Sequence, residues 1–309
     1  MEAPATTPPI KFAVVREDAD LECVLVERTG AREALVVASG GCTALTLTAR
    51  FPALRVTAFD TSPAQLAHVR DKLRAARRGD HEVLDHLNER GEFEGLFRVL
   101  RRFLEEFVFA EGEALRFFAA EAPEASARWR ASRYWPAAFA TAFNDPFLHA
   151  MFGPAATQHA PPGSYPGYFQ RAFEAGLARA DAPRNPFLQH VLLGRYRDED
   201  RPVYQSLHRD PDLTLVEGAL PDVGDLARFG VLSLSNVFDW SDDALVGVWA
   251  EALRSASPGA AVLIRQLNNT RDLRRFFGDR LRFDDALGAE LLERDRSLFY
   301  NRVEVAFVR

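Results

Sequence analysis

The stretch that decides the fold reads ALVVASGGCTAL and spans residues 34–45. Its first five residues form a continuous apolar run, which is typical of a strand buried on both faces of a sheet. The residues SGGC then form a sharp turn, and a helical pattern follows over 43–51. Glycines directly after a first strand allow the backbone to approach a ligand closely. The stretch therefore predicts the strand, turn and helix that open a nucleotide-binding α/β domain.

A second strand and its terminal acid strengthen this prediction. Residues 55–59 form another apolar run, Asp60 follows it, and the Ser62-Pro63 pair marks the start of a helix that runs to about 78. Asp60 lies about 20 residues after Gly40, the usual distance for an acid that binds two ribose hydroxyls. The alternative for the turn is a plain tight turn before a capped helix.

The predicted cofactor site consists of the turn, the acid and the first residues of the second helix. NAD enzymes bind a pyrophosphate at the helix N-terminus, whereas S-adenosylmethionine has no phosphate and tolerates a looser turn. The turn has no third glycine, and the tail at 298–308 is β-rich, so S-adenosylmethionine is favoured. The residues predicted to bind it here are Ser39, Gly40, Gly41, Asp60 and Ser62.

The remainder of the chain divides into a helical part and a second set of strands. Residues 79–209 show helical periodicity with many aromatics, and apolar strand patterns return at 213–216, 231–234 and 261–264. We predict an α/β fold, a doubly wound, Rossmann-type, methyltransferase-like sheet with a large helical insertion. The predicted segments are the first half of the sheet domain (1–78), the insertion (79–209) and the second half (210–309).

Composition limits the classes of partner. The 309 residues carry a formal charge of −6, which argues against nucleic acid as the main partner. Two cysteines and seven histidines without ligand spacing predict no metal site. Residues 1–9 lack the basic and apolar regions of a signal peptide, and no segment approaches the length of a membrane span. We expect a cytoplasmic protein, either free or in peripheral contact with the inner membrane.

With these residues in view, the chain resembles the BtaA-like proteins, whose lipid-making members are S-adenosylmethionine:diacylglycerol 3-amino-3-carboxypropyltransferases of betaine-lipid synthesis. The similarity rests on short pieces in a fixed order along nearly the whole chain. They are VRED at 15–18, ASGGCTAL at 38–45, FDTSPAQ at 59–65, NPFL at 185–188, GRY at 194–196, PVY at 202–204, LSNVFDW at 234–240, Arg265, and DRSLFY at 295–300.

This resemblance implies S-adenosylmethionine as a donor whose four-carbon amino-acid arm, rather than its methyl group, is transferred to an acceptor. Such a reaction needs groups that hold the arm, and an alcohol acceptor needs a base. Asp239, after the fourth strand, is the predicted base, with a helix cap as its alternative role. Tyr300 is predicted to line the acceptor pocket as a second catalytic residue, or instead to be a half-buried aromatic with its hydroxyl in water. Asn236 is predicted to contact the cofactor.

Charged residues near the strand ends are the candidates for holding the transferred arm. Arg265 is predicted to clamp its carboxylate, although a structural salt bridge explains the residue equally well. Glu17 and Asp18 are predicted to bind its ammonium group, or instead to cap a helix that starts near Ala19. Arg296 is the fourth predicted substrate-binding residue.

The helical insertion is expected to determine the acceptor, which is either a small molecule or a lipid. Its phenylalanines can form an acyl groove, with Arg98, Arg101 and Arg102 meeting anionic head groups. The simpler alternative makes Phe97, Phe103, Phe107, Phe117 and Phe118 a helical core and the arginines its solvated face.

Two other functions remain open on the sequence alone. One is methyl transfer from the same donor. The other is a non-catalytic cofactor- or lipid-binding module, because the chain reads SNVFDW at 235–240, where we expect a histidine in the lipid-making members.

Overall fold

The computed structural model describes residues 9–309 and contains one seven-stranded sheet in the order β3-β2-β1-β4-β5-β7-β6. Strands β1 to β5 run parallel, whereas β7 is antiparallel to both of its neighbours, β5 and β6. The strands are β1 (Glu33–Val37), β2 (Arg55–Asp60), β3 (Leu213–Glu217), β4 (Val231–Ser233), β5 (Ala261–Gln266), β6 (Leu281–Phe283) and β7 (Arg302–Val308). The predicted α/β class is confirmed, and the sheet is compatible with a Rossmann-like fold.

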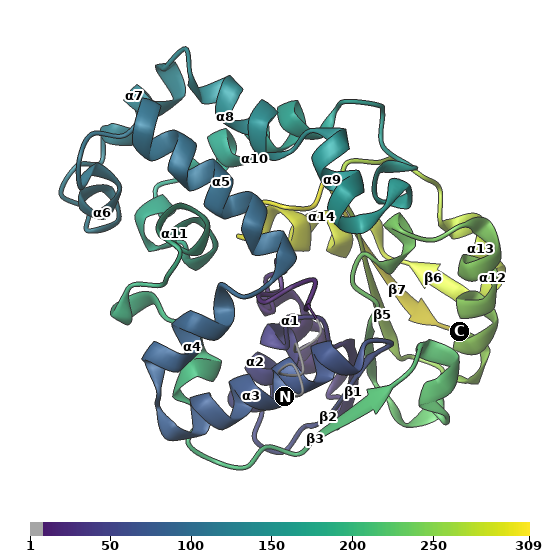
Figure 1. Ribbon diagram of the computed structural model, residues 1–309. Helices are drawn as coiled ribbons and strands as arrows, with labels where there is room; N and C mark the ends of the chain where they lie inside the picture. Colours follow the sequence, from purple (N-terminus) through teal and green to yellow (C-terminus); the bar gives the residue numbers. More distant parts are fainter. Residues whose placement is uncertain (1–8) are drawn as a thin grey trace, which may run out of the picture.

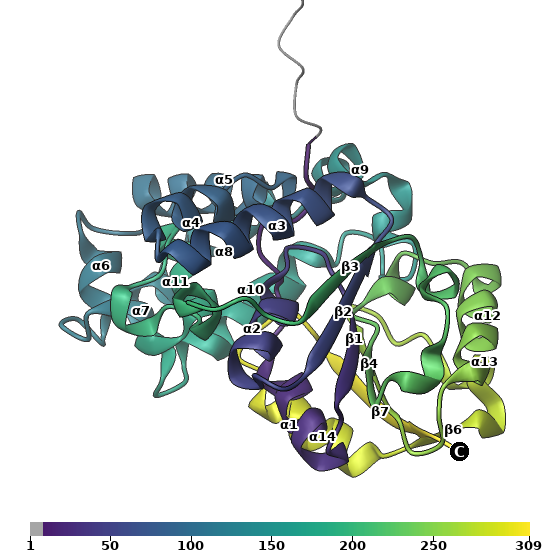
Figure 2. The ribbon, with the colours of Figure 1, turned by 90° about the horizontal axis from the view of Figure 1, so that it is seen from below.

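Helices cover both faces of the sheet (Figure 2). One face packs against α1 (Asp20–Thr29), α2 (Cys42–Arg50), α3 (Pro63–Arg78) and α14 (Asp285–Arg294). The other packs against α12 (Asp243–Ala252) and α13 (Arg274–Phe277). The central strands β1 and β5 contain the apolar runs at 34–37 and 261–264 because both of their faces are buried there, as the sequence predicts.

Eight α-helices lie between α3 and β3 and gather at one side of the sheet (Figure 1). Their aromatic residues form a separate core, in which Phe97, Phe117 and Phe118 are buried. These helices are α4 (His81–Asn88), α5 (Glu92–Phe107), α6 (Glu113–Phe118), α7 (Ala125–Ala131), α8 (Trp135–Ala142), α9 (Asp145–Phe152), α10 (Tyr165–Leu177) and α11 (Pro186–Leu193).

Two residues of α5 differ from their predicted environment. Phe107, expected in the helical core, is half exposed. Arg101, expected on a solvated face or against head groups, is buried and forms an ion pair with Glu89. The guanidinium of Arg101 also donates to the carbonyls of His190 and Val191, so it joins α5 to α11.

The C-terminal part contains an element that the sequence pattern does not reveal. β6 has only three residues at the edge of the sheet, too few to show alternation. In the β-rich tail at 298–308, the strand begins only at Arg302, and Leu298 adopts a left-handed backbone conformation with φ of 67°.

The segment at residues 10–18, which we call the strap, crosses the carboxyl ends of the parallel strands. Gln65 of α3 accepts hydrogen bonds from the amides of Lys11 and Phe12, at 2.8 and 3.3 Å. Glu94 of α5 accepts from the amides of Ala13 and Val14, at 2.9 and 3.2 Å. The strap is therefore fixed both to the sheet domain and to the helical insertion.

Residues 1–8, where the sequence predicts no signal peptide, lie outside the described part of the chain. Within residues 9–309, none of the helices combines the length and apolar character needed to cross a bilayer.

Candidate functional site

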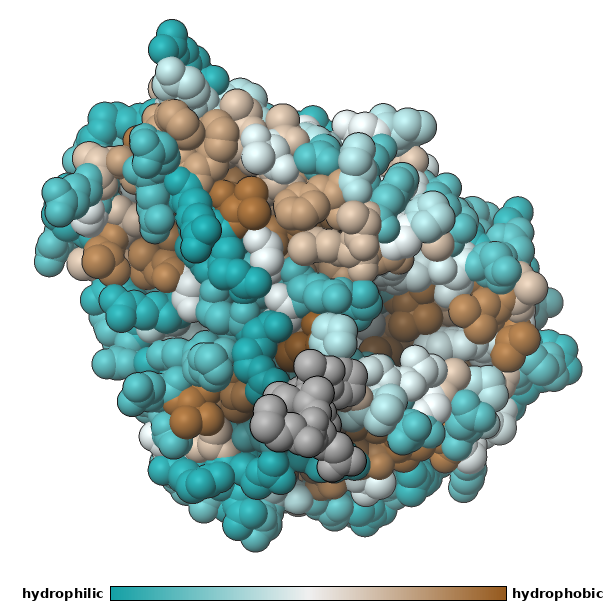
Figure 3. All heavy atoms as spheres, viewed as in Figure 1, coloured by the Kyte–Doolittle hydropathy of each residue, from teal (hydrophilic) through white to brown (hydrophobic). Residues whose placement is uncertain are grey.

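A cavity of about 380 Å³ lies where the carboxyl ends of the parallel strands meet the strap and the helical insertion. In Figure 3 this region is a depression with hydrophobic surface in its depth. Val37 and Ser39 after β1, Asp60 at the end of β2, and Ser235 after β4 all line it. Ligands of open α/β sheets bind at this edge, where the strand order changes direction between β1 and β4.

Asp60 lies at one end of the cavity and is already held by the backbone. Its Oδ2 accepts from the amide of Ser39 at 3.1 Å, and its Oδ1 accepts from the amide of Ser62 at 2.9 Å. Burial raises the pKa of Asp60, although these two amides favour the carboxylate. A carboxylate can accept about four hydrogen bonds, so further lone pairs are left for a ligand. Ser39 and Ser62 also line the cavity.

The two glycines of the turn do not line the cavity, because the chain itself occupies the space beside them. A Cβ on Gly40 would lie 2.7 Å from the carbonyl oxygen of Ala13 in the strap. A Cβ on Gly41, whose φ is 81°, would meet the side chain of Val69 in α3. The sequence predicts that the cofactor lies against the backbone of these glycines, but the strap lies against Gly40 instead. The glycines therefore affect the site by positioning the neighbouring segments of the chain.

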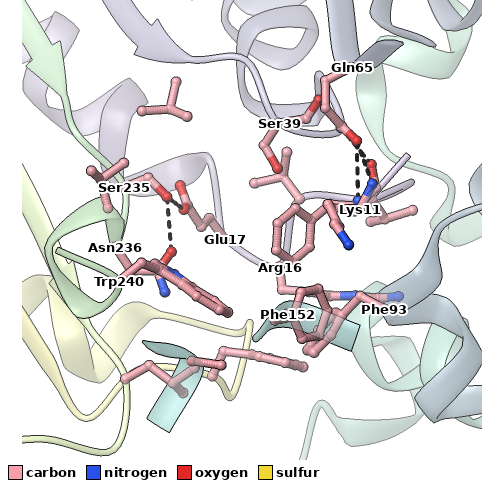
Figure 4. Close-up of a pocket in the computed structure, with 18 of the residues that line it drawn as sticks. Lys11, Arg16, Glu17, Ser39, Gln65, Phe93, Phe152, Ser235, Asn236 and Trp240 are labelled. Carbon is pink, nitrogen blue, oxygen red and sulfur yellow. Dashed lines mark hydrogen bonds between the residues drawn. The ribbon is translucent and has the colours of Figure 1, made fainter. Parts of the chain in front are cut away.

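Glu17 of the strap faces the cavity beside the end of β4 (Figure 4). Ser235 donates a short hydrogen bond to its Oε1, and the hydroxyl of Tyr300 lies 3.3 Å from the same atom. Glu17 is 6% exposed, and burial raises its pKa. Tyr300 also lines the cavity, so the structure brings these two predicted site residues together.

Arg265 lies beneath Glu17 and does not reach the cavity. Its Nη1 donates to Glu17 at 3.1 Å, and its two terminal nitrogens hold Glu22 at 2.7 and 3.0 Å. The side chain is fully buried, so the structural salt bridge, rather than the predicted substrate clamp, describes its contacts. Two buried carboxylates share this one guanidinium, which leaves negative charge on the side of Glu17 that faces the cavity.

Asp239, the predicted base, lies behind the wall of the cavity. Its carboxylate accepts from Asn236 Nδ2 at 3.1 Å, Leu267 N at 2.8 Å and Asn269 Nδ2 at 2.6 Å. Burial raises its pKa to about 7. Asp242, rather than Asp239, caps α12. Asp239 therefore connects the loops after β4 and β5 and positions Asn236, which does line the cavity.

Replacing Asp239 with alanine is expected to lower the free energy of unfolding by about 2–3 kcal/mol, since three donors lose a buried acceptor. Urea denaturation with the wild-type chain as reference measures this. Unchanged stability together with lost catalysis would instead support the role of base.

Asp18 and Arg296 lie on the other side of the strap. Arg296 donates to both carboxylate oxygens of Asp18, at 2.6 and 2.9 Å, and to Asp20. Asp18 also accepts from the amide of Asp20 at the start of α1, which is the capping alternative. Both residues line a second cavity of about 390 Å³ and neither lines the first. Glu17 lines both cavities, so of these two neighbours only Glu17 reaches the first one.

Aromatic residues line the side of the cavity that faces the insertion. Phe152 packs edge-on against Phe93 and against Trp240, with ring centroids 5.7 and 5.6 Å apart. Phe169 and Phe299 continue this wall. Phe93, Phe152 and Phe169 belong to α5, α9 and α10 of the insertion. Trp240 follows β4 and Phe299 precedes β7. The apolar wall of the cavity therefore depends on the insertion. Much of the phenylalanine content of the insertion still forms its separate core.

Three turns at this edge have left-handed backbone conformations at residues other than glycine. They are Ser39 after β1, Ser235 after β4 and Asn268 after β5, with φ of 44°, 55° and 54°. Such conformations cost about 1–3 kcal/mol each and cluster at functional sites. Their position around one cavity marks this edge as the candidate site.

Arg16 is a charged residue of the cavity wall to which the sequence patterns assign no role. It belongs to the VRED piece, yet nothing in that pattern tells which of its charged residues faces the site. Among residues 9–309, no group of histidine, cysteine or acidic side chains is arranged to hold a metal ion.

A scan against protein-family models finds no matching family. Searches of curated proteins and of solved structures find no significant match either. The function is therefore inferred from the geometry of the cavity and from the residues that line it.

Proposed function

We propose that the cavity binds S-adenosylmethionine and that the protein transfers the 3-amino-3-carboxypropyl arm of this donor to an acceptor. The observation that carries the proposal is Asp60, a partly buried acid at the end of β2 with lone pairs available beside the turn after β1. The strand order with an antiparallel β7 supports it, because methyltransferase-like sheets share this order. Asn236 and Ser62 line the same cavity and are further candidates for contacts with the donor.

Arm transfer breaks the bond between sulfur and the γ-carbon, leaves the electron pair on sulfur, and joins the γ-carbon to the acceptor oxygen. The negative charge at Glu17 faces the cationic donor. Tyr300 touches Glu17 and is placed to pass the acceptor proton to it. The product is methylthioadenosine. Much of the catalysis then comes from orientation and exclusion of water, because the sulfonium is already an activated leaving group.

The aromatic side of the cavity supports an acceptor with an apolar body and one hydroxyl, of which diacylglycerol is an example. Phe93, Phe152, Phe169 and Phe299 supply apolar surface next to Tyr300. A lipid acceptor would require peripheral contact with a membrane, whereas a small apolar alcohol would reach the same wall from the cytoplasm.

The test is to incubate the purified protein with S-adenosylmethionine and diacylglycerol dispersed in detergent, and to identify the nucleoside product. Arm transfer predicts methylthioadenosine together with an acceptor that has gained the four-carbon amino acid. S-adenosylhomocysteine as the product would identify a methyltransferase. Tight binding of the donor with neither product in a single turnover would identify a non-catalytic module.

The affinity for S-adenosylmethionine is expected to decrease as the pH is lowered. Burial raises the pKa of Glu17 above its ordinary value of 4.5, so protonation removes its negative charge at a higher pH than in an exposed glutamate. The cationic donor loses this attraction on the acidic side and regains it as the pH rises. Titrations on the acidic side of neutral pH should show this dependence in the wild type and a weaker one in Glu17→Gln, where only Asp60, whose pKa burial also raises, still titrates in the donor site. An unchanged dependence in Glu17→Gln would show that Glu17 does not attract the donor.

A further inference from the structure

Arg16 is a buried cation in the wall of the cavity with part of its hydrogen-bonding capacity unused. It is 5% exposed, and its guanidinium stacks on Phe97 with the central carbon 4.5 Å from the ring centroid. Nη2 lies 3.2 Å from Glu94 and 3.0 Å from Nδ1 of His190. Within residues 9–309, Nε and Nη1 have no hydrogen-bond partner, and both atoms are buried.

The groups around Arg16 in the described part of the chain provide no hydrogen-bond acceptor for Nε and Nη1. Glu94 divides its carboxylate between Arg16 and two amides of the strap, those of Ala13 and Val14. His190 carries no charge at neutral pH, because burial and then Arg16 hold its pKa well below the usual range. The other ionisable groups nearby are Glu89, which pairs with Arg101, and Lys72, which binds backbone carbonyls. A buried guanidinium with unpaired donors is costly unless a ligand completes its bonds.

The position of Arg16 indicates which part of a ligand it meets. Figure 4 shows its side chain running from the strap towards Phe93 and Phe152, whereas Glu17 points towards Ser235. Adjacent residues thus present opposite charges to the same cavity. Ser39 and Asp60 occupy another part of the wall. A ligand with a ribose at Asp60 and an α-amino-acid group towards the strap matches this distribution of charge.

We propose that Arg16 binds the carboxylate of the amino-acid arm of S-adenosylmethionine, the role that the sequence predicts for Arg265. This inference rests on the proposed function, since it assigns one group of the proposed donor. Arginine suits the task because charge-assisted hydrogen bonds to a carboxylate are about twice as strong as neutral ones. Holding the carboxylate against the insertion also fixes the arm, which orients the γ-carbon for attack by the acceptor.

The test compares three ligands by calorimetric titration with the wild type and Arg16→Gln. S-adenosylmethionine has the carboxylate, decarboxylated S-adenosylmethionine lacks only that group, and methylthioadenosine lacks the whole amino-acid end. Arg16→Gln should weaken binding of the first ligand by about 30-fold and leave the other two within about 3-fold. The wild type should prefer the first ligand to the second by a similar factor.

Two further variants control for folding. Arg101→Gln removes a buried arginine that belongs to the insertion and does not line the cavity, and it should bind all three ligands as the wild type does if folded. Arg16→Lys keeps the positive charge and should recover part of the lost affinity. It also replaces Arg16→Gln in the test if that variant does not fold, with the loss again confined to S-adenosylmethionine.

The outcomes separate this inference from the proposed function. Equal losses for all three ligands would show that Arg16 only supports the cavity, and an unchanged affinity for S-adenosylmethionine would show that it binds another group, such as an anionic part of the acceptor. Either result overturns the inference and leaves the donor site standing. A wild type that binds neither methylthioadenosine nor S-adenosylmethionine would overturn the proposed function and the inference with it.

Discussion

Replacing Asp60 with alanine is expected to lower the affinity for S-adenosylmethionine by at least about 100-fold. Two ribose hydroxyls would lose a charged acceptor, each such hydrogen bond contributes about 1.5–3 kcal/mol, and a tenfold change in affinity corresponds to about 1.4 kcal/mol. Methylthioadenosine should lose affinity to the same extent, because it keeps the ribose. Calorimetric titration of both ligands measures the effect.

The matched control for this variant is Glu217→Ala. Glu217 ends β3 directly beside Asp60 in the register of the sheet, but it is exposed and does not line the cavity. Its replacement should leave both affinities unchanged. If Asp60→Ala and Glu217→Ala behave alike, Asp60 does not bind the ribose.

Replacing Gly40 with alanine is expected to destabilise the protein by about 3 kcal/mol and to weaken donor binding as well. The added Cβ would lie 2.7 Å from the carbonyl oxygen of Ala13 and 2.9 Å from the amide nitrogen of Val14, both of them backbone atoms. The strap would have to move, and overpacking of this kind costs about 1–3 kcal/mol. Arg16 and Glu17 would move with the strap, because they belong to it.

Gly247→Ala in α12 provides the control, since a Cβ there meets no atom within 4 Å. Alanine in an exposed helix should stabilise by about 0.5–1 kcal/mol relative to glycine. Urea denaturation of the two variants measures the difference. Equal stabilities would contradict the close packing of the strap on the turn.

Local patterns in the sequence predict much of the sheet. Five apolar runs mark β1 to β5, and the acid at Asp60 follows from the position of the second run. Periodicity also distinguishes the helical insertion from the sheet, because the spacing of apolar residues changes there from strand-like to helical. The three-residue β6 escapes such reasoning, since its place depends on pairing with β7 across the sheet.

The roles of charged residues at the site depend on contacts between distant segments, which local patterns do not reveal. Arg265 and Arg16 are both arginines near predicted site segments, yet Glu17 and Glu22 surround the first. The second lines the cavity and keeps two buried donors without a partner in the described part of the chain. Glu17 and Asp18 are neighbours and both line the second cavity, but only Glu17 also lines the first. Asp239 follows a strand, as a catalytic base at this edge would, but hydrogen bonds from Leu267 and Asn269 hold its carboxylate outside the cavity.

A crystal structure of the protein with S-adenosylmethionine tests the central claim most directly. Our account predicts electron density in the cavity at the carboxyl edge of the sheet, with the ribose hydroxyls at Asp60 and the amino-acid arm between Arg16 and Glu17. Density for the donor in the second cavity, beside Asp18 and Arg296, would contradict it, as would an adenosine placed away from Asp60.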